Sequence, residues 1–390
     1  MWAGAVVPAR SLRALRYLAR NVATMMRSIP ALALLHVLAG NTNAQDVAAY
    51  VDYLDRFHVF DHGQFKQIEG QRPQAFQVGG DYVAYSSKNS DLRIYRNGQV
   101  TTLERTDAVE PTVTDHYLGY VIAGVLKVHD GEQLNTVCYN TGGHIVEDSV
   151  VAYFDERNQR LSAWYRGEEI VLEDALAQWP LENWKSGDNL IAYITTFEKK
   201  FKIFYDGDVW DVNFMVDADM PYQAGCDLVA FQDVVDLSFD AFYRGKFFDL
   251  EPVMPVRFEV GKGIMAYQDV NGALKVFEDG TIYTALDFPP QEWYVKDSLV
   301  VIKDQNFLKV FDEGKLHVVE RFWPEVWEAS WGAIGYVDQV RNVQLWRRSG
   351  RTTVTRGEPV QDIQLIRGLL VAYLNVRSVK VGWHGETYTH

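Results

Sequence analysis

The sequence predicts an all-β fold made of about ten repeats of about 36 residues each, and three observations support this prediction. A small residue followed by a large aromatic or apolar one recurs ten times inside apolar runs. A glycine follows each pair after 11 to 14 residues, and successive glycines are 33 to 40 residues apart. The period continues to residue 385, so we expect no separate catalytic domain among these repeats. The pairs are Ala49-Tyr50, Ala84-Tyr85, Gly119-Tyr120, Ala152-Tyr153, Ala192-Tyr193, Ala230-Phe231, Ala266-Tyr267, Val301-Ile302, Gly335-Tyr336 and Ala372-Tyr373, and the glycines are Gly63, Gly98, Gly131, Gly167, Gly207, Gly245, Gly280, Gly314, Gly350 and Gly385.

Residues 255–286 illustrate the strands expected in each repeat. The first strand, 255–260, begins at a proline, which is tolerated where no ladder hydrogen bond is lost. The apolar run 264–267 predicts a second strand covered on both faces, because its successive residues do not alternate. Asp-Val-Asn-Gly at 269–272 is a hairpin signal that leads into a third strand at 273–277. The periodic glycine then turns the chain into a fourth strand at 281–286.

Small four-stranded sheets covered on both faces by their neighbours describe the blades of a β-propeller. The small residue before each aromatic would let the neighbouring sheet approach closely. Ten units exceed the usual range of about four to eight blades, so two five-bladed rings or a partly open array are alternatives to one ring of ten. No linker separates the fifth and sixth units, which favours one ring. The first unit lacks its opening strand, so a three-stranded blade closes the ring unless the array is open.

The repeats resemble the TolB-like and WD40-like propeller repeats of exported bacterial proteins, and the likeness extends over residues 45–390. It implies an architecture and has little bearing on function. Trp210-Asp211 and Gly143-His144 each occur once, whereas WD40 units repeat both dipeptides from blade to blade.

Residues 1–44 predict a secretory signal peptide, with five arginines, no acid and an apolar stretch at 29–40. Cleavage after Ala44 would leave Gln45 as the first residue. The Asn-Ala-Gln ending resembles signal peptides of Bacteroidetes-type bacteria. The apolar stretch is shorter than the roughly 20 residues needed to span a bilayer, so a membrane-spanning chain is not expected. Two alternatives are an over-extended start at residues 1–24 and a mitochondrial presequence.

Charge restricts the classes of partner. Residues 45–390 hold 52 acids and 33 Lys plus Arg, a formal net charge of −19. Because a nucleic-acid partner requires a basic face, we expect no nucleic-acid binding. The predicted function is non-enzymatic: protein binding or scaffolding at a bacterial cell envelope, in the periplasm or outside the cell. The alternative is a carbohydrate-binding or glycan-active propeller with carboxylates lining its channel.

Tryptophans gather in the first strands and their lead-in segments, which line the central channel of a propeller. Exposed indoles there would stack on a peptide or on sugar rings, whereas buried ones would wedge between blades. The ligand-binding candidates are Trp184, Trp293, Trp323, Trp327 and Trp331, and the last three form the best candidate for an exposed aromatic patch.

Seven aspartates recur four or five residues before the large second-strand residue. We interpret them as turn residues, because a catalytic acid is usually unique; acids ringing one end of the channel and cation ligands are the alternatives. They are Asp46, Asp81, Asp115, Asp148, Asp188, Asp227 and Asp297.

Familiar catalytic and cofactor-binding motifs are missing from the sequence: His-Glu-x-x-His, Cys-x-x-Cys, Gly-x-Ser-x-Gly and the phosphate-binding glycine loops. No catalytic residue, metal ligand or cofactor is therefore predicted. Propeller glycosidases assemble their carboxylates from separate blades, so a unique carboxylate pair in the channel would favour an enzyme instead. Cys138 and Cys226 occupy non-equivalent positions, and no disulfide is expected between them.

Overall fold

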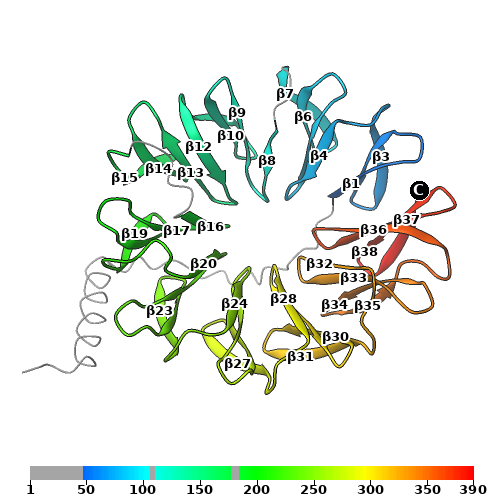
Figure 1. Ribbon diagram of the computed structural model, residues 1–390. Coiled ribbons are helices and arrows are strands. Elements are labelled where there is room, and N and C mark those ends of the chain that lie inside the picture. Colours follow the sequence, from blue (N-terminus) through cyan, green and yellow to red (C-terminus); the bar gives the residue numbers. More distant parts are fainter. Residues whose placement is uncertain (1–46, 106–109, 177–183) are drawn as a thin grey trace, which may run out of the picture. The chain divides into compact units, whose positions relative to one another are not determined.

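The computed structural model describes residues 47–105, 110–176 and 184–390. These residues form ten antiparallel sheets, of which nine have four strands and the first has three. Figure 1 shows the sheets following one another around a ring, and we number them as blades 1 to 10 in chain order. The predicted signal peptide at 1–44 lies outside the described residues.

The first five blades contain strands β1 to β19. Their bounds are β1 Val47–Val51, β2 Phe57–Asp61 and β3 Gln64–Glu69 in blade 1; β4 Ala75–Val78, β5 Tyr82–Ser86, β6 Asp91–Arg96 and β7 Gln99–Arg105 in blade 2; β8 Thr112–Val113, β9 Leu118–Ile122, β10 Val125–His129 and β11 Leu134–Cys138 in blade 3; β12 Thr141–Val146, β13 Val150–Asp155, β14 Arg160–Tyr165 and β15 Glu168–Glu173 in blade 4; and β16 Trp184–Gly187, β17 Leu190–Ile194, β18 Phe201–Tyr205 and β19 Asp208–Asn213 in blade 5.

The other five blades contain strands β20 to β39. Their bounds are β20 Tyr222–Gly225, β21 Leu228–Gln232, β22 Phe239–Tyr243 and β23 Lys246–Glu251 in blade 6; β24 Arg257–Val260, β25 Ile264–Gln268, β26 Leu274–Glu278 and β27 Thr281–Leu286 in blade 7; β28 Glu292–Lys296, β29 Leu299–Asp304, β30 Phe307–Asp312 and β31 Lys315–Glu320 in blade 8; β32 Trp327–Ser330, β33 Ala333–Val337, β34 Val343–Arg347 and β35 Gly350–Thr353 in blade 9; and β36 Val360–Ile366, β37 Leu369–Leu374, β38 Ser378–Trp383 and β39 Glu386–Thr389 in blade 10.

The second strands explain the small–large pairs of the sequence. Tyr85, Tyr193 and Tyr267 are almost wholly buried. At the small position of blade 9, a Cβ added to Gly335 would lie 2.5 Å from a methyl carbon of Leu370 in blade 10. The predicted close approach of neighbouring sheets is therefore confirmed, since only a small side chain leaves space for the next blade.

The ring is closed by apolar packing at all ten junctions between blades. Each junction has its own cluster of buried residues, including the junction between blades 5 and 6. Blade 1 meets blade 10 where Ala48 and Tyr50 pack against Leu369 and Val371. The single ring of ten is thus confirmed, as is the three-stranded first blade within the described residues.

A polar staple repeats at four junctions between blades. A glutamate at or next to the end of a blade's last strand accepts a hydrogen bond from the second-strand tyrosine of the next blade, 16 residues later, and pairs with a cation of that blade. In blade 7, Tyr267 Oη lies 3.0 Å and Lys275 Nζ 2.6 Å from the Glu251 carboxylate. The other three staples are Glu69 with Tyr85 and Arg93, Glu104 with Tyr120 and Lys127, and Glu320 with Tyr336 and Arg351. Each staple satisfies a buried hydroxyl and links two sheets.

Antiparallel strands place alternate turns at opposite ends of a blade, so the ring has two distinct faces. We call one the turn face: it holds the turns from first to second strand and from third to fourth strand. Asp279-Gly280 is of the second kind, with both φ angles positive, as a type I′ hairpin turn requires. The connection face holds the turns from second to third strand and the segments between blades. Both cysteines are free, and the described residues include no helix long and apolar enough to cross a membrane.

Candidate functional site

The turns between first and second strands meet around the axis of the ring, on the turn face. Neighbouring turns are joined by hydrogen bonds from blade 2 to blade 9. For example, Gly80 N donates to Asp115 O at 3.0 Å, and Lys262 N donates to Asp297 O at 2.7 Å. The Asp297 carboxylate in turn accepts from Trp331 N at 2.8 Å. The remaining links are Asp115 N to Asp148, Ser149 N to Asp188 O, Asp227 N to Asn189, and Gly263 N to Cys226 O.

Glycines allow this close contact of turns. A Cβ added to Gly187, Gly225 or Gly261 would lie 2.1 to 2.2 Å from a carbonyl oxygen of the next blade. Any side chain at these strand ends would force the neighbouring backbone away from the axis. The sequence therefore specifies a tight inner circle over blades 5 to 8.

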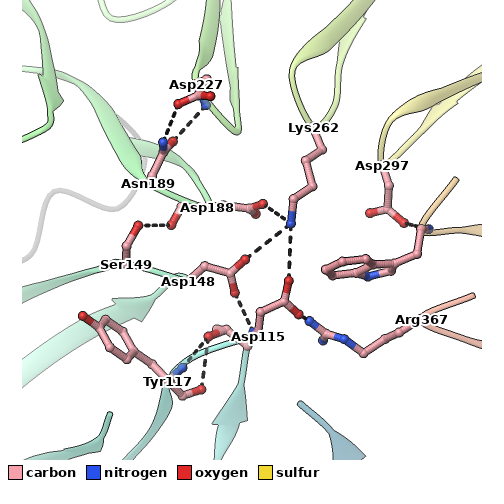
Figure 2. A network of polar contacts seen from close by, with 12 residues as sticks. Asp115, Tyr117, Asp148, Ser149, Asp188, Asn189, Asp227, Lys262, Asp297 and Arg367 are labelled. Atoms are coloured by element: carbon pink, nitrogen blue, oxygen red, sulfur yellow. Dashed lines mark hydrogen bonds and ion pairs between the residues drawn. The ribbon is translucent and has the colours of Figure 1, made fainter. Parts of the chain in front are cut away.

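Lys262 extends from the first turn of blade 7 towards three carboxylates across the axis (Figure 2). Its Nζ lies 2.7 Å from Asp188, 3.4 Å from Asp115 and 3.5 Å from Asp148. These acids come from blades 5, 3 and 4, at the equivalent turn of each blade. One ammonium thus balances three carboxylates, and the cluster is negative in sum unless another cation joins it.

Arg367, in the first turn of blade 10, supplies that second cation. Its guanidinium pairs with the Asp115 carboxylate, as Figure 2 shows, and Nη1 donates to Val78 O of blade 2 at 3.3 Å. Blade 10 is joined to blade 2 by this contact across blade 1, which lacks an inner strand in the described residues. The Trp331 ring lies 4.5 Å from Lys262 Nζ and 4.8 Å from the Arg367 guanidinium carbon, so both cations contact an aromatic ring.

Burial and neighbouring charges shift the pKa values of Glu147 and Lys262 at the axis. Burial, together with the nearby Asp188 and Asp148 charges, raises the pKa of Glu147 to about 7, against a hydrogen bond from Ser186. Burial lowers the pKa of Lys262, but Asp188 and Asp148 outweigh it and raise the pKa overall. The axis therefore contains a carboxyl that titrates near neutral pH beside carboxylates held by a lysine.

The periodic aspartates are turn residues, and several also ring one end of the axis. Asp115, Asp148 and Asp188 converge on Lys262, whereas Asp81 binds Arg96 of its own blade at 2.8 Å. Asp46 lies outside the described residues. The sequence period gave no means of detecting the convergence, because it depends on a lysine at a position where other blades carry aspartate.

Two of the five candidate tryptophans are buried. Trp184 stacks on Tyr193 with centroids 4.6 Å apart, and Trp293 packs between blades 7 and 8 beneath the Arg257 guanidinium. The prediction of a ligand-facing indole is wrong at these positions, because a ring wedged between sheets offers no face to a ligand.

The other three tryptophans do not form one patch. Trp331 lies at the axis on the turn face, whereas Trp323 and Trp327 lie where blade 9 begins, at the connection face. Trp323 and Trp327 are half-buried and meet edge to face with centroids 5.3 Å apart. Lys303 Nζ lies 5.4 Å from the Trp323 ring. Ligand binding by these three residues stays a prediction.

The connection face carries a feature that sequence reasoning missed. Among the described residues, fourteen of the twenty exposed large apolar side chains lie in its turns and connections, six lie on fourth strands, and none lies in a turn of the turn face. The fourteen are Leu54, Tyr139, Phe197, Phe214, Met215, Val235, Leu237, Val253, Val256, Val270, Phe288, Val326, Val340 and Val376.

Two other kinds of site can be assessed in the described part of the chain. It has no group of three or more His, Cys, Asp or Glu side chains arranged to hold a metal ion. A cavity of about 370 Å³ lies between blades 1 and 2, away from the axis, and Glu69, Pro73 and Arg93 are among its lining residues. Because Glu69 and Arg93 already form a staple, this cavity belongs to a junction between blades.

Residues 41–388 match the family model of the 10-bladed β-propeller domain. No curated protein matches the chain. The chain is similar in structure to a computationally designed protein, Ika8, with 16% identity, coverage of 71% of this chain and 93% of that one, and a TM-score of 0.33.

Two natural proteins show similar levels of likeness. Prp20p from Saccharomyces cerevisiae is 11% identical over 60% of this chain and 78% of its own, with a TM-score of 0.32. The CRINKLY WD40 ectodomain of the Arabidopsis thaliana receptor kinase ACR4 is 9% identical over 63% of this chain and 96% of its own, with a TM-score of 0.31. The family match covers most of the chain, and the protein therefore belongs to the 10-bladed β-propeller family.

Proposed function

We propose that this protein is a non-catalytic binding module that is exported to a bacterial cell envelope or exterior and holds a protein partner on its connection face. The propeller fold fits a binding or scaffolding role in general, because rigid blades present a broad surface of loops. Beyond this general role, we propose that the partner is a protein and that the location is the cell envelope or exterior.

The observation that carries the proposal is the distribution of exposed apolar side chains. Large exposed apolar patches usually mark surfaces that bind other molecules. A random placement would scatter such residues over both faces, yet within the described residues they are confined to the connection face and the outer strands. A protein partner fits a broad apolar area with a charged rim better than a small ligand does.

Export is supported by the basic and apolar segment at 1–44 and by the Thr-Asn-Ala sequence at its end. Sequencing the N-terminus of protein recovered from the producing cell tests this part. A chain that begins at Gln45 is the expected result, and a chain that retains residues 29–44 contradicts export.

Affinity capture tests the binding function. Full-length protein is immobilised and exposed to an envelope extract of the producing organism, and retained proteins are identified after competition with free chain. We expect a protein that free chain displaces. If only glycan is retained, or if nothing is displaced, the protein-binding proposal fails.

A glycan-active propeller is a second candidate, favoured by the carboxylates at the axis. Glycoside hydrolysis uses one protonated and one ionised carboxyl group. Glu147, with its pKa raised to about 7, lies near the Asp148 and Asp188 side chains. Against this candidate, Lys262 already occupies the space between the aspartates. Turnover of a glycan that Glu147→Gln abolishes in a folded protein would establish the enzyme, whereas a glycan screen without turnover would remove its support.

A further inference from the structure

Three neighbouring loops of the connection face carry exposed apolar side chains on blades 5 and 6. They are the second-to-third strand turn at 195–200, the connection at 214–221 and the next second-to-third strand turn at 233–238. We define the apolar patch as the exposed residues Phe197, Phe214, Met215, Val235 and Leu237 in these loops. Met215 is 89% exposed and Phe197 is 69% exposed, so the side chains stand in solvent and do not fold back onto the sheets.

Contacts place the three loops side by side. Val216 N donates to Lys199 O at 2.9 Å, which holds the connection against the turn of blade 5. Asn213 Nδ2 donates to Gln232 O at 3.0 Å, which holds the same connection against blade 6. The connection that contains Phe214 and Met215 therefore lies between the other two loops, and the exposed apolar side chains of all three loops lie on one surface.

The backbone of the patch is strained as well as exposed. Met215 and Leu237 have φ angles of 56° and 58°, in the left-handed region that large apolar residues rarely adopt. Within the described chain, the other large apolar residue of this kind is Trp331 at the axis. Backbone strain and solvent-exposed apolar side chains both destabilise the folded protein. Strained backbone conformations cluster at functional sites in proteins.

Charge indicates what kind of partner covers the patch. The three loops contain five acids and two lysines, a net charge of −3, and one of the lysines, Lys200, pairs with Glu198 at 2.6 Å. Asp217 and Asp219 are exposed beside Met215. An apolar surface with an acidic rim favours a segment that combines apolar side chains with Lys or Arg.

We propose that the apolar patch docks a cationic apolar segment of the protein partner, an inference that rests on the proposed protein-binding function. A second copy of this chain is a poor occupant, because pairing two patches would bring two acidic rims together in a protein with a net charge of −14. An anionic membrane surface is repelled for the same reason.

Peptide titration of the full chain tests the inference. The probe is a short synthetic peptide of alternating lysine and leucine, and the comparison peptides replace lysine with glutamate or leucine with serine. We expect the lysine–leucine peptide alone to bind, with an affinity that falls as salt increases, since exposed charges are screened. The double variant Phe214→Ser/Met215→Ser should weaken binding about tenfold or more, and Asp217→Asn/Asp219→Asn should reduce its dependence on salt.

The matched control is Val340→Ser/Val376→Ser, which removes two similarly exposed apolar residues from blades 9 and 10 of the same face. This control should leave binding unchanged. Three results would each overturn the inference. The first is an equal loss of binding in both double variants, and the second is equal binding of the glutamate–leucine peptide. The third is a dimer, seen in sedimentation, that dissociates in Phe214→Ser/Met215→Ser. If no peptide binds but a captured partner does, the docking inference fails while the protein-binding function stands.

Discussion

On the turn face, Lys262 and Arg367 bind carboxylates from other blades, whereas on the connection face fourteen large apolar side chains lie in solvent. The two cations of the first face pair with carboxylates inside the molecule, and these pairs join blades that are far apart in the sequence. The apolar groups of the second face stay exposed to solvent in the folded monomer. The turn face therefore adds charged contacts across the axis to the apolar junctions that close the ring, whereas the connection face is the one that we propose for partner binding.

The largest expected effect comes from removing the Arg367 contacts across the axis. Arg367→Met leaves the buried Asp115 carboxylate without its guanidinium and removes the contact with Val78. We expect the free energy of unfolding to fall by about 3 kcal/mol, at the low end for a buried pair because Lys262 still contacts Asp115. Urea denaturation measures it. Arg166→Met, which breaks an exposed pair with Asp206, should cost at most about 0.5 kcal/mol; equal losses would mean that the axis has no special role.

The pH dependence of stability tests the charges at the axis. The pKa of Glu147 is raised from 4.5 to about 7, so the folded state favours its protonated form. Stability should therefore fall as pH rises from about 4.5 to 7, by at most about 3 kcal/mol, and the loss is complete above pH 7. Glu147→Gln should lack this component of the pH profile when the two proteins are denatured in parallel. Identical profiles would show that Glu147 is not buried beside Asp148 and Asp188.

A smaller effect is expected from widening the inner circle. Gly225→Ala places a Cβ 2.1 Å from the Gly261 carbonyl oxygen, so the turns of blades 6 and 7 must move apart. A cost of about 2 kcal/mol is typical of such overpacking. In Gly70→Ala the new Cβ meets no atom within 4 Å, and the thermal midpoint should not change. A harmless alanine at position 225 would contradict the tight circle.

The smallest effect concerns the repeated staples. Tyr267→Phe and Tyr120→Phe each remove one hydrogen bond to a glutamate that keeps its lysine. Each should lower the free energy of unfolding by about 1 kcal/mol, and the two values should agree because the staples are equivalent. Clearly different values would mean that the junctions are not interchangeable, in contrast to the single-copy contacts of the axis.

Periodic features of this protein are readable from its sequence. The strands of blade 7 begin and end within about two residues of their predicted positions, because tight turns fix the bounds of short strands. The staples also have a fixed spacing: the glutamate comes 16 residues before the second-strand tyrosine, as in Glu251 and Tyr267. This spacing is the signal that could have revealed them.

Features that occur once are not readable in this way. Lys262 reaches Asp148 and Asp115 across 114 and 147 residues, and Arg367 reaches Val78 across 289. Such pairs can be predicted only when the number of blades and the closure of the ring are known, because these decide which turns face each other across the axis. The exposure of Met215 could not be predicted for another reason: the sequence of a loop does not show whether its apolar residues are buried or exposed to solvent.

The division of roles between the two faces is tested most directly by the affinity of the captured partner for variants of each face. We expect Phe214→Ser/Met215→Ser to weaken binding about tenfold or more. Arg166→Ser/Asp206→Ser, which removes an exposed pair on the turn face, should leave binding unchanged. Both proteins should unfold cooperatively within a few degrees of the natural chain; a small decrease is expected in the turn-face variant, because Asp206 also accepts a hydrogen bond from Tyr165 Oη. Loss of binding in the turn-face variant with full binding in the connection-face variant would contradict this division of roles.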